Sequence, residues 1–325
     1  MSKYLITGIT GFAGPHLANL LLKNNHEVHG LIRNSNGREQ DIRDIMNDEE
    51  YANLIFHYSD LNNRKLLDEI FINNEFDGVF HLAAQSHPPT SFLDPIGTFN
   101  ENIINSANLI QSIVENQPKC KFMFCSTSEV YGNSGIDGKK IHWESNLKPS
   151  NPYGTSKAAI DLFMQERMTN NFIDGFITRA FSHTGPRRGK NFSISSDAYQ
   201  IARIMKGLQD PVLKIGNLDS VRVVIDVRDT VNAYYLAMIN DNSSNKIFNV
   251  CGDIPQKMGY FTDKLIELSD KQIEKEVSKE LYRDIDIHYQ HGDSSNLKDI
   301  TKWEPTIDIE QTLEDLLNYW LKKIN

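Results

Sequence analysis

The stretch that decides the fold of this chain reads Lys3-Tyr4-Leu5-Ile6-Thr7-Gly8-Ile9-Thr10-Gly11-Phe12-Ala13-Gly14. Residues 3–7 have the apolar pattern of a short strand, and the leucines between positions 17 and 22 predict a helix after the glycines. Glycines at 8, 11 and 14 permit a tight turn, a close approach of the backbone to a pyrophosphate, and close helix–strand packing. The first N–H groups of the helix would then face the anion. We therefore predict a dinucleotide-binding loop whose contacts are Gly8, Thr10, Gly11, Phe12, Ala13 and Gly14.

Further apolar segments alternate with predicted helices along the N-terminal half. The strands predicted after the first are Glu27–Ile32, Leu54–Tyr58, Gly78–Leu82, Lys121–Cys125 and Phe176–Arg179. Such alternation with short connections implies an α/β fold, a Rossmann-type doubly wound parallel sheet with helices on both faces. Ligands of these sheets bind beyond the carboxyl ends of the strands, so we expect the functional site along that edge.

The residue after the second strand indicates which dinucleotide is bound. An NAD site is expected to have an Asp or Glu there, to hold the ribose hydroxyls of the adenosine. This chain has Arg33 instead, with Arg38 nearby, and a guanidinium suits a 2′-phosphate. We therefore predict NADP rather than NAD. Residues 1–178 are expected to form the NADP-binding Rossmann domain, with elements returning around 222–250, and residues 179–325 mainly a smaller interleaved substrate-binding lobe.

The fourth predicted strand is followed first by small residues and then by polar ones. Small side chains would let the backbone of the cofactor pass, and the polar ones would face the cleft. The candidate cofactor contacts here are Leu82, Ala83 and Ala84, and the candidate substrate contacts are Gln85, Ser86 and His87.

A second motif, Asn151-Pro152-Tyr153-Gly154-Thr155-Ser156-Lys157, opens a predicted helix near the middle of the chain. Tyr153 and Lys157 are four positions apart and therefore emerge on one face of that helix, about one turn apart. An ammonium beside a phenol favours the phenolate, so we expect Lys157 to lower the pKa of Tyr153 toward the value that a general base needs.

The C-terminal half contributes a turn with two arginines, Gly185-Pro186-Arg187-Arg188-Gly189, which is suited to a phosphate or is a solvated basic loop. Residues 223–229 are predicted to be a strand that ends at a helix start, Asp229. Amphipathic helices are predicted over 262–268 and 309–321, and the leucines of the second are assigned to the core.

Composition restricts the class of protein. The 325 residues carry a net charge of −9, which argues against nucleic acid or an anionic membrane as the main partner. The three cysteines lack the spacing of zinc ligands, so no metal site is predicted. Neither a signal peptide nor an apolar run near the roughly 20 residues of a membrane span is evident, and we expect a cytoplasmic protein.

With these residues in view, the chain resembles the extended short-chain dehydrogenase/reductase family that remodels nucleotide sugars. The matching motifs are the TGxxGxxG loop at Thr7–Gly14, Asp60-Leu61, His81-Leu82-Ala83-Ala84, Tyr153 with Lys157, and Arg222 before Asp226-Val227-Arg228-Asp229. Within that family it is most similar to nucleotide-sugar 4,6-dehydratases of the GDP-mannose 4,6-dehydratase type and to GDP-4-keto-6-deoxymannose reductase. Ser126–Glu129 and Gly185–Gly189 look like the dehydratase, whereas His183–Gly185 leans toward the reductase.

The resemblance implies roles for individual residues. Thr127, Tyr153 and Lys157 would form the catalytic set, with Glu129 as the acid/base and Ser128 as a second route for a proton. Cofactor contacts would include Asp60, which could accept a hydrogen bond from the adenine amino group, and Leu61. The implied substrate contacts are Ser182, Arg187, Asn217, Arg222 and Arg283.

The implied function is that of a GDP-sugar 4,6-dehydratase. It would convert a GDP-hexose to the GDP-4-keto-6-deoxy sugar by internal hydride transfer and loss of water, and NADP could stay tightly bound. Ser182 stands where the family usually has Asn, and Val223 where an Asp commonly follows the arginine. Because these two positions differ from the family pattern, the sugar expected from the resemblance is either mannose or a variant such as N-acetylglucosamine or a heptose. A 4-keto-6-deoxy-sugar reductase or a nucleotide-sugar epimerase is the alternative. The resemblance also implies pairing through two helices from each subunit, those that contain Asn102 and Tyr153, so we expect a homodimer, with a tetramer as the alternative.

Overall fold

The computed structural model describes residues 1–33, 38–281 and 287–324, and only the backbone of Arg38 and Lys279. Its centre is a seven-stranded parallel sheet in the order β11-β6-β5-β4-β1-β2-β3. The strands are β1 (Lys3–Thr7), β2 (Glu27–Ile32), β3 (Leu54–Tyr58), β4 (Gly78–His81), β5 (Lys121–Thr127), β6 (Gly175–Ala180) and β11 (Lys246–Val250). The predicted α/β fold is confirmed, and the order reverses at β1, whose neighbours are β2 and β4.

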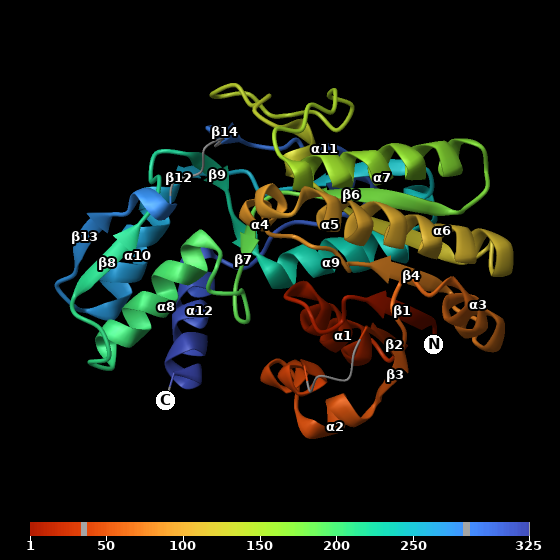
Figure 1. The fold of residues 1–325 in the computed structure, drawn as a ribbon, viewed down its shortest axis with the longest axis horizontal. Coiled ribbons are helices and arrows are strands. Elements are labelled where there is room, and N and C mark those ends of the chain that lie inside the picture. The colour runs from red at the N-terminus through yellow and green to blue at the C-terminus, as the bar shows by residue number, and fades with distance from the viewer. Residues whose placement is uncertain (34–37, 282–286, 325) are drawn as a thin grey trace.

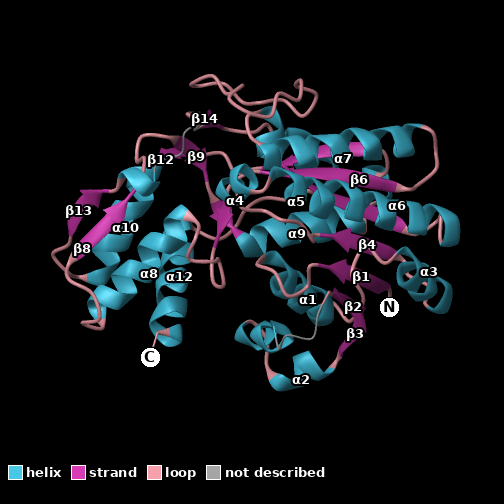
Figure 2. Cartoon of the chain, viewed as in Figure 1, coloured by secondary structure: helices cyan, strands magenta, loops and turns pink. Residues whose placement is uncertain are grey.

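Helices cover both faces of this sheet, as Figure 2 shows with cyan helices flanking the magenta strands. One face carries α1 (Ala13–Lys23), α9 (Val227–Met238) and α11 (Ser295–Thr301), and the other carries α3 (Arg64–Asn73), α6 (Asn105–Asn116) and α7 (Pro152–Thr169). Neighbouring residues of a strand point to opposite faces, so Ile6 packs into one apolar cluster and Leu5 into the other. Short elements complete this sheet lobe: η1 (Arg38–Asp44), α2 (Asp48–Ala52), α4 (Pro88–Leu93), α5 (Pro95–Phe99), η2 (Asn100–Ile104), η3 (Ser128–Tyr131) and η4 (Asp241–Ser243).

A smaller lobe lies beside the sheet lobe and contains the C-terminal end of the chain (Figure 1). Its helices are α8 (Ser193–Met205), α10 (Met258–Ser269) and α12 (Ile309–Lys323), with the short η5 (Lys279–Leu281). Its strands are β8 (Val212–Ile215), β9 (Val221–Val223), β12 (Pro255–Lys257), β13 (Glu274–Val277) and β14 (Tyr289–Gln290). Leu213, Phe261 and Leu313 belong to its own apolar cluster, so this lobe has a core of its own.

The chain passes between the lobes more than once. After β6 it runs through β7 (His183–Thr184) and α8 into the smaller lobe, and β10 (Ile225–Asp226) leads it back to α9 and β11. The two lobes are therefore built from interleaved segments.

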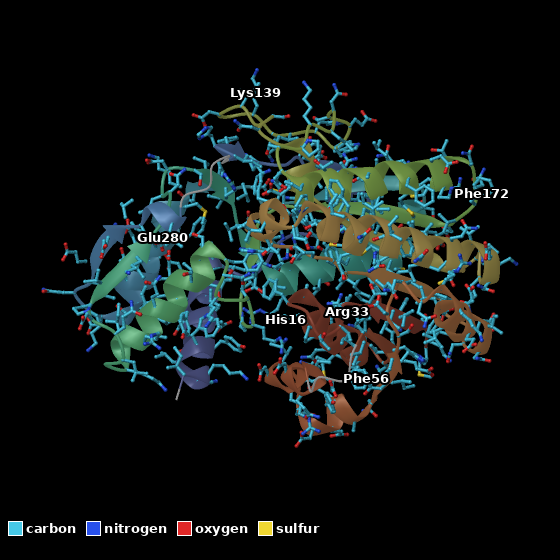
Figure 3. All side chains as sticks on the ribbon, in the orientation of Figure 1. His16, Arg33, Phe56, Lys139, Phe172 and Glu280 are labelled. Atoms are coloured by element: carbon cyan, nitrogen blue, oxygen red, sulfur yellow. The ribbon has the colours of Figure 1, made fainter. Side chains whose placement is uncertain are left out.

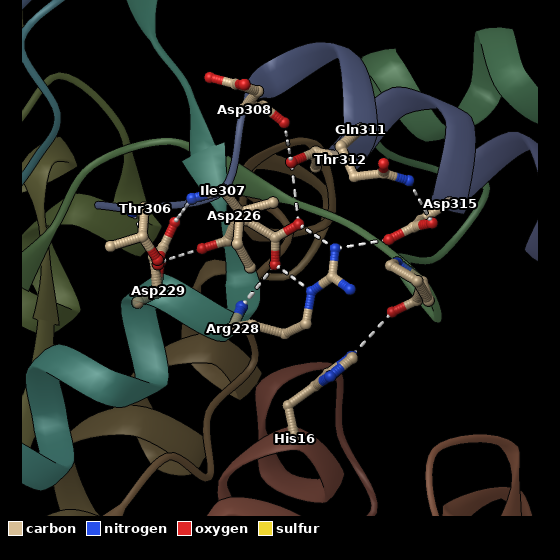
Figure 4. A network of polar contacts seen from close by, with 12 residues as sticks. His16, Asp226, Arg228, Asp229, Thr306, Ile307, Asp308, Gln311, Thr312 and Asp315 are labelled. Atoms are coloured by element: carbon tan, nitrogen blue, oxygen red, sulfur yellow. Dashed lines mark hydrogen bonds and ion pairs between the residues drawn. The ribbon is translucent and has the colours of Figure 1, made fainter.

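The start of α9 differs from the sequence prediction. The predicted start at Asp229 is wrong, because Asp226 is the N-cap and accepts a hydrogen bond from the backbone N–H of Arg228 at 2.7 Å. Asp229 is instead a buried acceptor for the backbone N–H groups of Thr306 and Ile307. Figure 4 shows this network, in which Arg228 also reaches Asp315 of α12 and so ties the helix to the smaller lobe.

Among the helices that the structure describes, none is both long enough and apolar enough to cross a membrane.

Candidate active site

A cavity of about 1350 Å³ lies between the carboxyl edge of the sheet and the smaller lobe. On the sheet side it is lined by the loop after β1, the residues after β4 and β5, and the first turns of α7. The smaller lobe contributes the start of α8, residues 216–217 and residues 280–281. Figure 3 labels Arg33 and Glu280, which line the cavity from the sheet lobe and the smaller lobe respectively. The cavity thus covers the point where the strand order reverses, the usual ligand position in such sheets.

The glycine loop has the geometry of a pyrophosphate cradle. Gly8 has φ +75°, and a Cβ there would lie 2.7 Å from the backbone nitrogen of Ala83. A Cβ on Gly14 would lie 2.5 Å from the carbonyl oxygen of Gly8, so α1 packs directly on the loop. No side chain of the described residues caps the N-terminus of α1, which leaves its first N–H groups available to an anion. The residues present therefore fit a dinucleotide, and all six predicted loop contacts line the cavity.

Arg33 lies at the adenosine end of this predicted site. Its guanidinium is held by Glu101, with Nη1 2.7 Å from both carboxylate oxygens, and its Nε lies 4.0 Å from Asp60. The side chain is 59% exposed and lines the cavity together with Asp60 and Leu61. The guanidinium of Arg33 thus lies where the sequence predicts a positive charge, and the carboxylates of Glu101 and Asp60 are its partners.

The Thr127–Tyr153–Lys157 set is brought together in the wall of the cavity. Thr127 ends β5, and its hydroxyl is hydrogen-bonded to the phenol of Tyr153 in the first turn of α7. Lys157 lies one turn further along, buried, with its ammonium 4.4 Å from the ring centroid of Phe124. The structure therefore gathers these three residues: Tyr153 and Lys157 on one helix, as their spacing predicts, and Thr127 beside them, as the resemblance implies.

The electrostatics of Tyr153 differ from the prediction. Burial raises the pKa of Tyr153 above its ordinary value, and the hydrogen bond with Thr127 only partly opposes this. Burial also lowers the pKa of Lys157 to about 8. The prediction of an acidic Tyr153 is wrong in direction for the protein's own groups, because burial disfavours the phenolate and raises the pKa; the cation that opposes this rise is Arg188, not Lys157.

Glu129 lines the cavity from η3, directly after β5. Its Oε2 accepts a hydrogen bond from Nδ2 of Asn151 at 2.7 Å. The neighbouring Ser128 is buried, and its hydroxyl donates to Oε1 of Gln290, in β14 of the smaller lobe, at 3.1 Å. Sequence reasoning missed Asn151 and Gln290 as neighbours of Glu129 and Ser128. Asn151 belongs to the motif around Tyr153, but no role was predicted for it, and Gln290 stands near no recognised motif.

The polar residues after β4 separate into two groups. Ser86 and His87 line the cavity, and so do Leu82, Ala83 and Ala84. The prediction that Gln85 faces the cleft is wrong, because its Nε2 donates to Thr98 Oγ1 at 3.1 Å and its Oε1 accepts from the N–H of His87. The backbone N–H of His87 needs a hydrogen-bond partner, and the side chain of Gln85 supplies it instead of contacting a ligand.

The two adjacent arginines point in different directions. Arg187 has φ +74° and donates to the carbonyl oxygens of Thr10 and Gly11 at 3.2 and 3.3 Å, so it lines the cavity beside the glycine loop. Arg188 lies between two rings, its guanidinium carbon 3.5 Å from the centroid of Phe192 and 4.8 Å from that of Phe12. Burial lowers the pKa of Arg188 to about 10, and no carboxylate of the described residues forms an ion pair with it. Arg188 is the better-placed cation for an anionic substrate.

The smaller lobe completes the cavity. Ser182, Asn217 and Arg222 line it as predicted, whereas the predicted contact Arg283 lies outside the described residues. Sequence reasoning missed Asp197 of α8, which also lines the cavity and accepts a hydrogen bond from Thr262 at 2.7 Å. Burial raises the pKa of Asp197 to about 7.

Comparisons with known proteins bear on the chemistry of this cavity. A family model described as GDP-mannose 4,6 dehydratase matches residues 5–316. GDP-6-deoxy-D-mannose reductase of Pseudomonas aeruginosa is 32% identical over 76% of this chain and 81% of its own length. Human GDP-mannose 4,6 dehydratase is 27% identical over 97% of this chain and 90% of its own length. The solved structure of RMD from Pseudomonas aeruginosa complexed with NADPH aligns over 100% of both chains, with a TM-score of 0.84 and 26% identity.

Proposed function

This chain belongs to the GDP-mannose 4,6 dehydratase family, and we propose that it is itself a GDP-sugar 4,6-dehydratase. Its substrate would be GDP-mannose or a variant such as GDP-N-acetylglucosamine or a GDP-heptose, and its product the GDP-4-keto-6-deoxy sugar. The observation that carries the proposal is Glu129, a carboxylate that lines the same cavity as Thr127 and Tyr153. Reduction of a ketone needs one proton-transferring group, whereas elimination of water needs a second one for the C5 proton.

We propose NADP as the cofactor. The glycine loop would hold the pyrophosphate, Arg33 the 2′-phosphate, and Asp60 the adenine. Glu101 keeps the guanidinium of Arg33 in place at the cavity wall, so a phosphate would meet a positioned cation. Calorimetric titration with NADP and NAD tests this: Arg33→Gln should weaken NADP about tenfold and leave NAD unchanged. Tighter binding of NAD by the wild-type protein would overturn the choice of NADP.

Two side chains, Tyr153 and Glu129, would transfer the protons of the reaction. Tyr153, oriented by the hydroxyl of Thr127, takes the proton of the sugar 4-OH, and the 4-ketone that forms acidifies the C5 proton. When bound, an oxidised nicotinamide supplies the hydride acceptor for C4, the hydride returned to C6, and a positive charge that favours the phenolate. Glu129 removes the C5 proton and then protonates the 6-OH, which leaves as water. Once C6 has received the hydride, Tyr153 gives the proton that it took from the 4-OH to C5, so both side chains return to their starting state. Ser128 is the less suitable proton donor, because its hydroxyl proton is already donated to Gln290.

Mass spectrometry of product mixtures is the direct test. We would incubate the protein with a panel of GDP-, UDP-, CDP- and dTDP-hexoses without added cofactor, and expect one GDP-sugar to lose the mass of one water. In Glu129→Gln the loss of water should stop while NADP binding is unchanged, and Glu144→Gln, a substitution at an exposed loop carboxylate, is the matched control. Unchanged turnover in Glu129→Gln would remove its proposed role.

The reductase remains the second candidate, since the reductase relative is 32% identical to this chain. Its signature would be a gain of two hydrogens when NADPH and a 4-keto sugar are supplied, with no loss of water from any GDP-hexose. An epimerase would instead give an isomer of unchanged mass.

We also propose a homodimer formed through the α5, η2 and α7 surface. These elements pack on one another and expose apolar side chains, with Ile96 65%, Leu162 56% and Ile104 52% exposed. Contiguous exposed apolar residues are typical of an interface. Leu162→Glu should shift the protein toward the monomer in sedimentation experiments, whereas a tetramer in the wild type would indicate a further contact surface.

A further inference from the structure

Asn151 connects the start of the catalytic helix to Glu129. It is the N-cap of α7, with extended backbone (φ −148°, ψ 161°), and it is 9% exposed. Its Oδ1 accepts a hydrogen bond from the backbone N–H of Gly154 at 2.7 Å, and its Nδ2 donates to Oε2 of Glu129 at 2.7 Å. Both ends of one amide are therefore used.

The direction of the amide follows from its partners. A backbone N–H can only donate, so the oxygen of Asn151 must face Gly154 and the amino group must face the carboxylate. Ser, Thr and Asp also cap helices through an oxygen, but none of them carries a second group that donates nitrogen-bound hydrogen to Glu129. Only asparagine combines the cap with this donor.

The same segment restrains Glu129 through its backbone. A Cβ added to Gly154 would lie 2.8 Å from the carbonyl oxygen of Glu129, so the first turn of α7 packs directly on η3. Tyr153 lies between Asn151 and Gly154 in the sequence, and Glu129 is one of the charges that its phenol senses. The cationic side chains that line the same cavity are those of Arg33, Lys157, Arg187, Arg188, Lys190 and Arg222. Tyr153 and Glu129 are thus held at a fixed relation by one helix start.

We propose that Asn151 is a positioning residue that holds the carboxylate of Glu129 aimed at the sugar for removal of the C5 proton. A hydrogen bond donated to a carboxylate favours its ionised form, and it also removes rotational freedom from the side chain. The inference rests on the proposed dehydratase function, because it concerns the step that distinguishes elimination from simple reduction.

Two variants test this while keeping the helix cap. In Asn151→Ser and Asn151→Asp an oxygen remains to cap α7, but the donor to Glu129 is lost, and in Asn151→Asp a second carboxylate faces it. We expect turnover for loss of water to fall about 10- to 100-fold, and the acid limb of its pH profile to move up by about one unit, more in Asn151→Asp. NADP affinity and the melting temperature should stay near the wild-type values.

Asn63 provides the matched control, since it caps α3 by accepting from the N–H of Leu66, away from the cavity. Asn63→Ser and Asn63→Asp should leave turnover and the pH profile unchanged. Wild-type turnover and an unmoved acid limb in Asn151→Ser would overturn the proposal, as would a loss of activity that merely follows a lower melting temperature and weaker NADP binding. If the wild-type protein itself removes no water from any GDP-sugar, the proposed function fails instead, so the two failures are distinguishable.

Discussion

Two walls of the cavity differ in how far apart in the sequence their contacting residues lie. The catalytic wall, formed by Thr127, Glu129 and Tyr153, depends on neighbours such as Asn151, which is 22 positions from Glu129. The arginine wall, formed by Arg187 and Arg188, is fixed by contacts such as that between Arg187 and Thr10, which are 177 positions apart. Changes in the catalytic wall should therefore affect the chemistry alone, whereas changes in the arginine wall should also affect how the glycine loop binds its cofactor.

The largest effect is expected at the catalytic wall, in Tyr153→Phe. Removal of the phenol oxygen eliminates the acceptor for the sugar 4-OH proton, so turnover should fall about 10²- to 10⁴-fold. NADP binding, measured by calorimetry, should change little because the glycine loop is untouched. Tyr235→Phe is the control, since its hydroxyl meets His26 of the sheet lobe. Similar turnover in the two variants would show that the catalytic wall is misassigned.

The second prediction separates the two arginines. Arg188→Ala removes a half-buried cation that no described carboxylate pairs with, and we expect KM for the sugar nucleotide to rise about 10- to 100-fold. Arg187→Ala removes the hydrogen bonds to the glycine loop, so its main effect should be weaker NADP binding. Measurement of KM and of NADP affinity in both variants checks the distinction. If the two effects were exchanged, the assignment of the two side chains would be reversed.

The smallest effect is expected for stability, at Asp197 in the smaller lobe. Burial raises the pKa of this carboxyl to about 7 from an unfolded value near 4, so the folded state holds a proton that the unfolded state lacks between those pH values. The free energy of unfolding should therefore decrease as pH rises from about 4 to 7. Asp197→Asn keeps an acceptor for Thr262 without titrating, and should stabilise the protein by about 1–3 kcal/mol at pH 8.

Denaturant titrations of the wild type and Asp197→Asn at pH 5 and pH 8 measure that difference. The stabilisation should be present at pH 8 and nearly absent at pH 5. An equal difference at both pH values would mean that Asp197 does not carry a buried charge. Thr262→Val, which removes the donor, should destabilise the protein at pH 8.

Much of the catalytic wall and of the glycine loop follows from the sequence alone. The positive φ and close approach at Gly8, the strand before it and the helix after it are local requirements, so a glycine spacing predicts them. Tyr153 and Lys157 share a face because helix periodicity places residues four apart together. Alternation of strands and helices determined the parallel sheet, and with it the edge at which these residues meet.

Only the tertiary structure decided the rest. The sequence does not distinguish Arg187 from Arg188, and both line the cavity. Arg187, with its left-handed backbone, donates to the glycine loop, whereas Arg188 packs against Phe192. The direction of the pKa change at Tyr153 depends on burial, which is set by segments distant in the chain. Side-chain direction and desolvation arise from the packing of both lobes, and local periodicity carries no information about either.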